Sequence, residues 1–261
     1  MNELKTNNVH LIKGDCLEVM KNIKANSIDM ILCDLPYGTT ECSWDNIIDI
    51  EKLWDIYERI IKDNGAIVLF GNEPFSTKLR NSRFNLYKYD WIWIKNTPTG
   101  HLEAKNKPLR KYENIIVFSK GNSANGCKNR ITYNPQGLIE VNKTKKTSSA
   151  SVWGTRPSRQ KGNIIVQKYT NYPTNILEFK KDKERLHPTQ KPVKLLEYLI
   201  KTYTNDGDTI LDNCMGSGST GVAVLKVGGD RKFIGIELDD KYFDIACNRI
   251  RGDNFCGLIY I

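Results

Sequence analysis

The sequence lacks several features that mark specialised classes of protein. No apolar run approaches the roughly 20 residues of a membrane-spanning helix, and the N-terminal MNELKTNNVH has no apolar core of a signal peptide. The seven cysteines form no CxxC pair, and the three histidines are scattered. We therefore expect a cytoplasmic protein with reduced thiols, no membrane partner and no bound metal ion.

Positive charge is abundant but unevenly distributed. The 261 residues include 39 Lys and Arg against 30 Asp and Glu, a formal net charge of +9. Residues 120–186 hold 14 basic and four acidic side chains, a surplus of +10, so the rest of the chain is near neutral. A basic segment on a neutral body indicates a polyanionic partner, although a solvated lysine-rich loop would show the same bias.

Hydrophobic periodicity predicts alternating strands and helices on both sides of this basic segment. Strand patterns occupy residues 9–15, 28–34, 66–71, 87–95, 113–120, 208–212 and 232–239. Helical patterns occupy residues 16–23, 46–62, 73–82, 192–203, 219–228 and 241–250. Repeated strand–helix units predict an α/β domain, with a mostly parallel sheet and helices on both faces. We expect this domain to comprise residues 1–120 and 187–261, with residues 121–186 as a loop-rich insertion.

Two strand ends near the C-terminus have the pattern of a nucleoside site. In ILDNCMGSGSTG, residues 210–221, a strand ending at Asp212 runs into a glycine-rich turn and a helix. Glycines let a ligand approach the backbone, and a helix N-terminus offers free N–H groups. The next strand ends at Glu237, where an acid can hold both ribose hydroxyls. A merely tight turn and a nicotinamide dehydrogenase remain alternatives for this loop alone.

The strand at residues 28–34 ends in an unusual polar and aromatic sequence, DLPYG. In a doubly wound sheet, ligands bind outside the carboxyl ends of neighbouring strands whose connections leave toward opposite faces. If the strands ending at Asp34 and Asp212 are neighbours, DLPYG and the glycine-rich turn share one crevice. Residues almost 180 positions apart would then form a single site.

Four motifs occur in a specific order: DLPYG, HPTQKP at residues 187–192, DNCMGSGSTG and IGIELD. In this order they resemble the S-adenosylmethionine-dependent DNA amino-methyltransferases, N6-adenine and N4-cytosine, of the permuted (beta) group. The resemblance covers residues 9–120 and 187–250. It implies a Rossmann-like class I methyltransferase fold, with a mostly parallel seven-stranded sheet and one antiparallel edge strand. It also implies S-adenosylmethionine as cofactor, double-stranded DNA as substrate and a target-recognition role for residues 121–186.

The resemblance also assigns roles to individual residues. It implies that Asp34, Pro36 and Tyr37 are catalytic. It implies cofactor contacts at Asp15, Cys16, Asp34, Gln190, Lys191, Asp212, Gly216, Ser217, Gly218, Ser219, Thr220 and Glu237. Candidate DNA contacts are Lys105, Lys107, Arg110, Lys111, Arg156 and Arg159, with Trp153 or Tyr169 at the opened base pair. We expect His187 to be structural.

The chemistry of amine methylation explains why a strand would end in DLPYG. The N6 lone pair of adenine is delocalised into the ring, so the amine is a poor nucleophile. Asp34 can accept one N6–H bond and a backbone carbonyl of Leu35 or Pro36 the other, while Tyr37 offers a stacking face. Leu35 stands where the commonest family pattern has proline, but a backbone carbonyl survives that change.

Several targets and partners remain open at this point. The leading acid favours adenine N6 over cytosine N4, and an RNA or a protein amide is a less favoured target. Carbon-5 cytosine methylation is disfavoured because tyrosine, not cysteine, follows Pro36. A basic DNA-binding module without catalysis is the non-enzymatic alternative. The resemblance also raises a cognate restriction endonuclease and a homodimer as partners.

Overall fold

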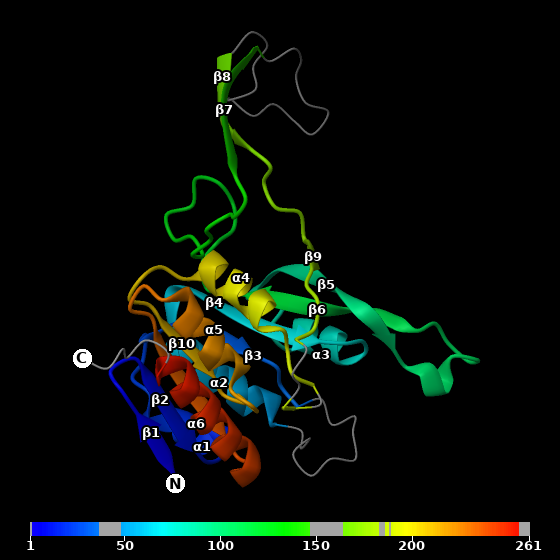
Figure 1. Cartoon of the computed structure of the whole chain (residues 1–261). Helices are drawn as coiled ribbons and strands as arrows, with labels where there is room; N and C mark the ends of the chain where they lie inside the picture. Colours follow the sequence, from blue (N-terminus) through cyan, green and yellow to red (C-terminus); the bar gives the residue numbers. More distant parts are fainter. Residues whose placement is uncertain (1, 37–47, 147–163, 183–185, 188, 256–261) are drawn as a thin grey trace. The chain divides into compact units, whose positions relative to one another are not determined.

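The computed structural model describes residues 2–36, 48–146, 164–182, 186–187 and 189–255 (Figure 1). Contacts divide the chain into two units, a larger one of Met1–Asn134 with Asn175–Ile261 and a smaller one of Pro135–Thr174. None of the described helices is both long enough and apolar enough to cross a membrane.

The larger unit contains most of the secondary structure. Its strands are β1 (Glu3–Lys5), β2 (Val9–Lys13), β3 (Ile28–Cys33), β4 (Ile61–Gly71), β5 (Tyr87–Thr99), β6 (Arg110–Phe118), β9 (Ile176–Glu178), β10 (Thr209–Asp212) and β11 (Lys232–Glu237). Its α-helices are α1 (Cys16–Val19), α2 (Ile50–Ile60), α3 (Phe75–Ser82), α4 (Val193–Tyr203), α5 (Ser219–Val227) and α6 (Asp240–Phe255). Two 3-10 turns, η1 (Met20–Asn22) and η2 (His101–Glu103), complete it.

One sheet runs through the larger unit. Its described strands have the order β1-β2-β11-β10-β3-β4-β6-β5-β9. The five neighbours from β2 to β4 are parallel, whereas β6 is antiparallel to both β4 and β5. The α/β class with a mostly parallel sheet is therefore confirmed.

The sheet differs from our expectation in two details. It has nine described strands instead of seven, because the short strands β1 and β9 extend its two edges. The antiparallel strand β6 lies inside the sheet, between β4 and β5, although β1 is antiparallel at one edge. Since β6 returns from β5 as a hairpin and then pairs with β4, both of its sides are hydrogen-bonded.

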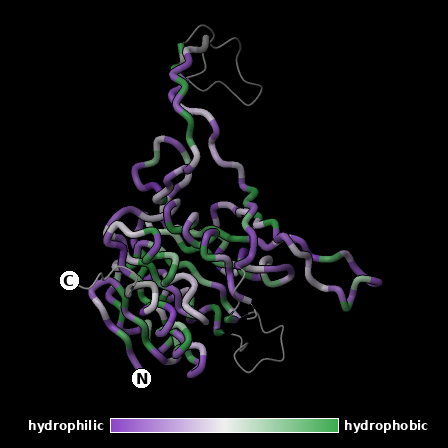
Figure 2. Tube along the Cα trace, in the orientation of Figure 1, coloured by the Kyte–Doolittle hydropathy of each residue, from purple (hydrophilic) through white to green (hydrophobic). Residues whose placement is uncertain are grey.

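Apolar cores cover both faces of this sheet. Alternate side chains of β3 point to opposite faces, so Met30 and Leu32 join one core while Ile31 and Cys33 join the other. Residues of α4, α5 and α6 contribute to the first core, and residues of α1, α2 and α3 to the second. Figure 2 shows hydrophobic residues concentrated along the inner strands. The result is a three-layer arrangement with a helix layer on each face.

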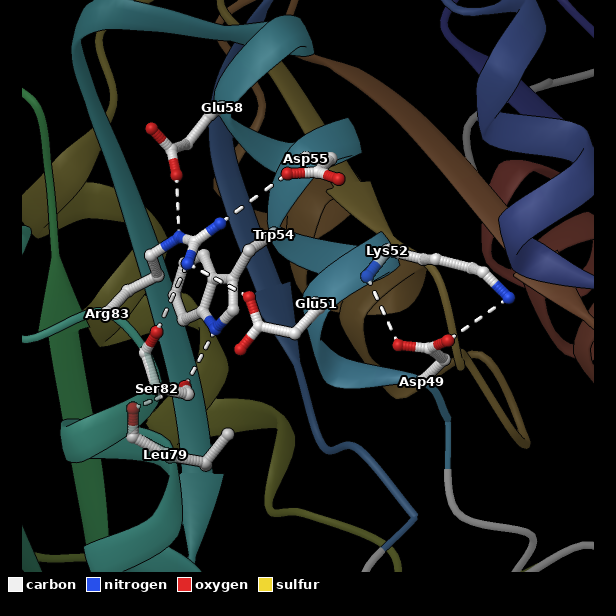
Figure 3. Close-up of polar contacts among 9 residues, drawn as sticks. All are labelled: Asp49, Glu51, Lys52, Trp54, Asp55, Glu58, Leu79, Ser82 and Arg83. Atoms are coloured by element: carbon white, nitrogen blue, oxygen red, sulfur yellow. Dashed lines mark hydrogen bonds and ion pairs between the residues drawn. The ribbon is translucent and has the colours of Figure 1, made fainter.

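Helix α2 is attached to the C-terminal end of α3 and to the next residue, Arg83, by one hydrogen bond from a buried side chain and several ion pairs (Figure 3). The fully buried Trp54 donates from Nε1 to Ser82 Oγ at 2.8 Å. The Arg83 guanidinium pairs with three carboxylates of α2, those of Glu51, Asp55 and Glu58, at 2.8–3.5 Å. Exposed ion pairs contribute about 0–1 kcal/mol each, so burial of Trp54 does more to anchor α2.

The smaller unit contains a two-stranded sheet of β7 (Ile139–Lys146) and β8 (Ile164–Thr170). The two strands pair antiparallel from Ile139↔Thr170 to Lys146↔Ile164. This unit lies within the predicted insertion, residues 121–186, but its bounds are narrower, because residues 121–134 and 175–186 group with the larger unit. Its role in target recognition stays a prediction.

Candidate active site

The candidate site lies at β3 and β10, two neighbouring strands whose following helices pack on opposite faces of the sheet. Strand β10 pairs in parallel with β3, through Ile210↔Met30 and Leu211↔Ile31. Helix α5, which follows β10, packs on one face, and α2, which follows β3, packs on the other. A cavity of about 690 Å³ lies at the carboxyl ends of these strands, and Asp34 and Asp212 both line it. The two strand ends therefore share one crevice, as the sequence predicted.

The cavity brings together most of the predicted cofactor and catalytic residues. Those that line it are Asp15, Cys16, Asp34, Pro36, Gln190, Lys191, Asp212, Gly216, Ser217, Ser219, Thr220 and Glu237. Gly218 is not among the lining residues. It begins α5 with φ +77°, and a Cβ there would lie 3.0 Å from Ala246 Cβ, so glycine lets α5 pack against α6. Tyr37, Trp153, Arg156 and Arg159 lie outside the described residues.

The glycine-rich turn is organised around the buried carboxyl group of Asp212. Thr220 Oγ1 donates to Asp212 Oδ2 at 2.6 Å, and the backbone N–H of Cys214 donates to Oδ1 at 3.2 Å. Asp212 is only 4% exposed, and this burial raises the pKa of its carboxyl group to about 7 despite the hydrogen bonds. Asp212 is therefore partly protonated near neutral pH.

Glu237 connects this turn to the segment after β11. Its Oε2 accepts a hydrogen bond from the Gly216 N–H at 2.8 Å, and its Oε1 accepts one from the Asp239 N–H at 2.9 Å. Burial raises the pKa of Glu237 above its ordinary value. The carboxylate thus lies at the wall of the cavity beside two loop segments, at the strand end predicted to hold a ribose.

Asp34 is paired with a buried lysine. Lys191 Nζ lies 2.5 Å from Asp34 Oδ2 and 3.3 Å from Glu113 Oε2, and 5.0 Å from the centre of the Phe70 ring. Burial alone would lower the pKa of Lys191, but the carboxylates of Asp34 and Glu113 raise it above its ordinary value. The ammonium is therefore charged, and Asp34 is its nearest anionic partner.

Sequence reasoning missed the support beneath the turn. Tyr57 of α2 is fully buried, and its hydroxyl lies 2.5 Å from Oδ1 of Asn213, which lines the cavity. The sequence predicted a helix over residues 46–62 but no role for Tyr57, and Asn213 was not singled out although it follows Asp212 in the motif. Proximity to Asp212 was the one available signal for Asn213.

His187 is another lining residue whose surroundings define its state. Its ring packs 4.2 Å from the ring of Tyr242, and its Nδ1 accepts from the Thr189 N–H at 3.2 Å. Burial, together with the positive charge of Lys191, lowers the pKa of His187 to about 4. The imidazole is therefore neutral near pH 7 and contributes shape and hydrogen bonding.

The predicted DNA-binding residues of the larger unit lie elsewhere. The outer ends of β5 and β6 and the loop between them, residues 96–111, are called the β5–β6 arm. It carries four exposed basic residues that line no part of the cavity: Lys105, Lys107, Arg110 and Lys111. The arm projects from the sheet in Figure 1. Lys107 Nζ is 2.6 Å from Glu103 Oε2, so its charge is partly compensated. Across the residues that the structure describes, no cluster of His, Cys, Asp and Glu could hold a metal ion.

Comparison with known proteins identifies the family. The sequence profile of the N6/N4 DNA methylases matches residues 28–248. The chain belongs to this family. It is therefore an S-adenosylmethionine-dependent DNA methyltransferase, as the four motifs implied.

Individual relatives agree with this assignment. The DNA adenine methyltransferase YhdJ of Escherichia coli is 29% identical over 267 residues, which cover 95% of this chain and 83% of YhdJ. The structure of M1.HpyAVI in complex with S-adenosylmethionine is 23% identical, with a TM-score of 0.62 over 93% of this chain and 98% of that one. The cytosine-N4-specific PvuII methyltransferase is 15% identical, with a TM-score of 0.64 over 94% and 87%. The two structures show that the fold is shared.

Proposed function

We propose that this methyltransferase acts on the N6 amine of adenine in double-stranded DNA. The observation that carries the proposal is the carboxylate of Asp34, which lies at the end of β3 in the same cavity as Asp212 and Glu237. An amine that must be aimed at a methyl donor needs a hydrogen-bond acceptor at this position. The relative YhdJ, an adenine methyltransferase by name, supports the same choice.

The residues present fit the cofactor. S-adenosylmethionine supplies a methyl group on a positively charged sulfur, and the cavity's volume of about 690 Å³ suits a ligand of this size. Glu237 would hold the ribose hydroxyls, and Asp15 and Cys16 would border the adenine. Asp212 and the N-terminal residues of α5, Ser219 and Thr220, would lie at the methionine end, with Gln190 and Lys191.

The adenine base would be held by DLPYG. Asp34 would accept one N6–H bond and the Leu35 or Pro36 carbonyl the other, so that the nitrogen lone pair is directed at the methyl group. Asp34 also stabilises the positive charge that develops on the nitrogen. Pro36 restricts the backbone that carries these carbonyls. Stacking of the flipped base on Tyr37 is part of the proposal.

DNA outside the cavity would be held by basic residues. Lys105, Lys107, Arg110 and Lys111 would contact phosphates, and Arg156 and Arg159 would contact base edges. The proposal also includes cytoplasmic location, a cognate restriction endonuclease and a homodimer, the last of which light scattering on the purified protein tests.

Nucleoside analysis tests the target. Duplex DNA incubated with the enzyme and S-adenosylmethionine is digested, and the nucleosides are identified by mass spectrometry. We expect N6-methyladenine, whereas N4-methylcytosine as the product would overturn the proposal. Duplex RNA in molar excess over the DNA should not inhibit methylation of the DNA. Effective competition would indicate an RNA substrate.

A substitution tests the role of Asp34. Asp34→Ala should lower kcat by about 100-fold or more, since it removes the acceptor of the substrate amine. The matched control is Asp55→Ala, an exposed acid of α2 whose loss should leave kcat unchanged. Full activity of Asp34→Ala would contradict the mechanism.

A further inference from the structure

Four charged side chains form a series of ion pairs that extends from strands β5 and β6 to the cavity. Lys95 Nζ of β5 lies 3.2 Å from Glu113 Oε1 of β6, and Glu113 Oε2 lies 3.3 Å from Lys191 Nζ. Lys191 Nζ in turn lies 2.5 Å from Asp34 Oδ2. The side chains of Lys95, Glu113 and Lys191 are 3%, 12% and 9% exposed, and that of Asp34 is 22% exposed.

We propose that Glu113 and Lys95 are positioning residues for methyl transfer, which hold the Lys191 ammonium and through it orient the carboxylate of Asp34. Asp34 and Lys191 line the cavity, whereas Glu113 and Lys95 stand behind them. The inference rests on the proposed role of Asp34 as the acceptor of the substrate amine.

The arrangement answers an electrostatic requirement. A buried ammonium group is stable only if it is paired and hydrogen-bonded. If Asp34 were the sole partner of Lys191, it would have to serve both a strong cation and the incoming amine. Glu113 shares the cation, so Asp34 does not have to balance the charge of Lys191 alone. Lys95 balances Glu113, which would otherwise be a nearly buried anion with one partner.

The charged groups that the structure describes around Lys191 act on its charge in opposite directions. Asp34 at the end of β3 and Glu113 on β6 favour the ammonium, and the Phe70 ring of β4 lies under it at 5.0 Å. His187 is neutral near pH 7, because burial lowers its pKa to about 4. Lys95 opposes the charge of Lys191 by repulsion but also lowers the pKa of Glu113, whose burial has the opposite effect.

Removing the charge of Glu113 should therefore change the pH dependence of the reaction. In Glu113→Gln, burial of Lys191 is opposed by Asp34 alone, so the pKa of Lys191 falls and the ammonium is lost at a lower pH. We expect the alkaline limb of the kcat/KM profile to move to lower pH. At neutral pH kcat should fall about 10–100-fold, as for groups that orient a functional side chain, with KM for S-adenosylmethionine nearly unchanged.

Removing Lys95 as well should partly reverse the effect. Glu113→Gln alone leaves two buried lysines, of which only Lys191 still has a carboxylate partner, Asp34. In the double variant Glu113→Gln with Lys95→Met, Lys191 is the single buried lysine and is paired with Asp34. We expect the alkaline limb of the double variant to lie between those of Glu113→Gln and the wild type. Glu113→Asp, which keeps the charge, should restore the limb toward its wild-type position.

The experiment measures methyl incorporation into duplex DNA from pH 6 to 10, with circular dichroism to verify folding. The wild type should show no alkaline limb from Lys191 in this range, because the pKa of Lys191 is raised above its ordinary value, whereas Glu113→Gln should show one. Glu51→Gln, an exposed glutamate of α2, is the matched control and should behave as wild type. Wild-type pH profiles and kcat in folded Glu113→Gln and in the double variant would overturn the inference. If Glu113→Gln alone does not fold, the double variant decides, since it lacks the unpaired Lys95, and a wild-type profile there also overturns it.

Failure of the proposed function would be recognised separately. The identity of the methylated nucleoside, read from wild-type enzyme, decides between adenine and cytosine. The shift of the pH profile is read from total methyl incorporation, whichever base receives the methyl group.

Discussion

Binding of S-adenosylmethionine should strengthen as the pH rises toward 8, because a buried carboxyl group of the cavity must ionise to meet a cationic ligand. Burial raises the pKa of Asp212 to about 7, and the Thr220 hydroxyl and the Cys214 N–H only partly offset this. The cofactor carries a sulfonium and an ammonium group. We expect these cations to favour the carboxylate form of Asp212.

The size of the effect follows from this pKa. At pH 6, one unit below the pKa of about 7, ionising Asp212 costs about 1.4 kcal/mol, which corresponds to about tenfold in Kd. At pH 8 the cost is close to zero. The same pKa lies above the unfolded value of about 3.9, so the folded state binds the proton more tightly. The unliganded protein should therefore lose stability as the pH rises from about 4 to about 7.

Calorimetry can test this linkage. Titrations at pH 6, 7 and 8, in buffers with different ionisation enthalpies, give both Kd and the number of protons released. We expect close to one proton released at pH 6 and almost none at pH 8. Asp212→Asn should abolish the pH dependence and weaken binding at pH 8. Glu237→Gln, at another buried acid of the cavity, should weaken binding but keep the tenfold dependence on pH.

Two groups other than Asp212 must be distinguished in this assay. His187 titrates near pH 4 and does not contribute between pH 6 and 8. Glu237 has a raised pKa, and its variant measures that contribution directly. A wild-type Kd that is flat between pH 6 and 8 would refute the reasoning, and so would an Asp212→Asn variant that keeps the slope.

Two further predictions concern support and DNA binding. Tyr57→Phe should lower the free energy of unfolding by about 1–3 kcal/mol in urea denaturation, because it leaves the Asn213 amide oxygen unpaired; a loss below about 0.5 kcal/mol would contradict this. Each alanine substitution of a residue proposed to bind phosphate in the β5–β6 arm should reduce the slope of log affinity against log salt by about 0.9. The reduction should be smallest for Lys107, because Glu103 pairs with it. An unchanged slope would exclude a phosphate contact. The residues to test are Lys105, Lys107, Arg110 and Lys111.

The pattern of strands and helices could largely be predicted from the sequence. The apolar runs at residues 28–33 and 66–71 appear as buried strands, because parallel strands covered on both faces are hydrophobic throughout. Boundaries were less accurate. We expected a helix over residues 46–62 and a strand over residues 66–71, but α2 ends at Ile60 and β4 begins at Ile61, which pairs with Ile28. Pairing of Ile61 with β3 outweighed the local helical pattern.

The position of the antiparallel strand within the sheet could not be predicted from local sequence. The segment ENIIVF has the same apolar pattern whether it runs parallel or antiparallel to its neighbours. Its place between β4 and β5 depends on the register of the hairpin, with Trp93 opposite Glu113 and Val68 opposite Val117. Such long-range pairing leaves no trace in local periodicity.

The site divides in the same way. Asp212 and Glu237 belong to continuous motifs at strand ends, where local sequence predicts a function. Glu113 and Lys95 lie in strands, 18 positions apart, and only the β5–β6 pairing brings them to 3.2 Å. A charged residue in a strand is normally read as an exposed position, so their burial beside Lys191 needs the three-dimensional structure to be seen.

The cavity and the β5–β6 arm favour ligands of opposite charge. Among the residues that the structure describes, seven acids line the cavity against two lysines, which favours a cation, whereas the exposed lysines of the arm favour a polyanion. The acidic lining residues are Asp15, Asp34, Asp49, Asp212, Glu237, Asp239 and Asp240. Methyl transfer removes the positive charge from the cofactor's sulfur, so the spent cofactor loses an attraction that S-adenosylmethionine has. If S-adenosylmethionine binds in this cavity as proposed, the acids that strengthen binding of the donor would also favour its exchange after each transfer.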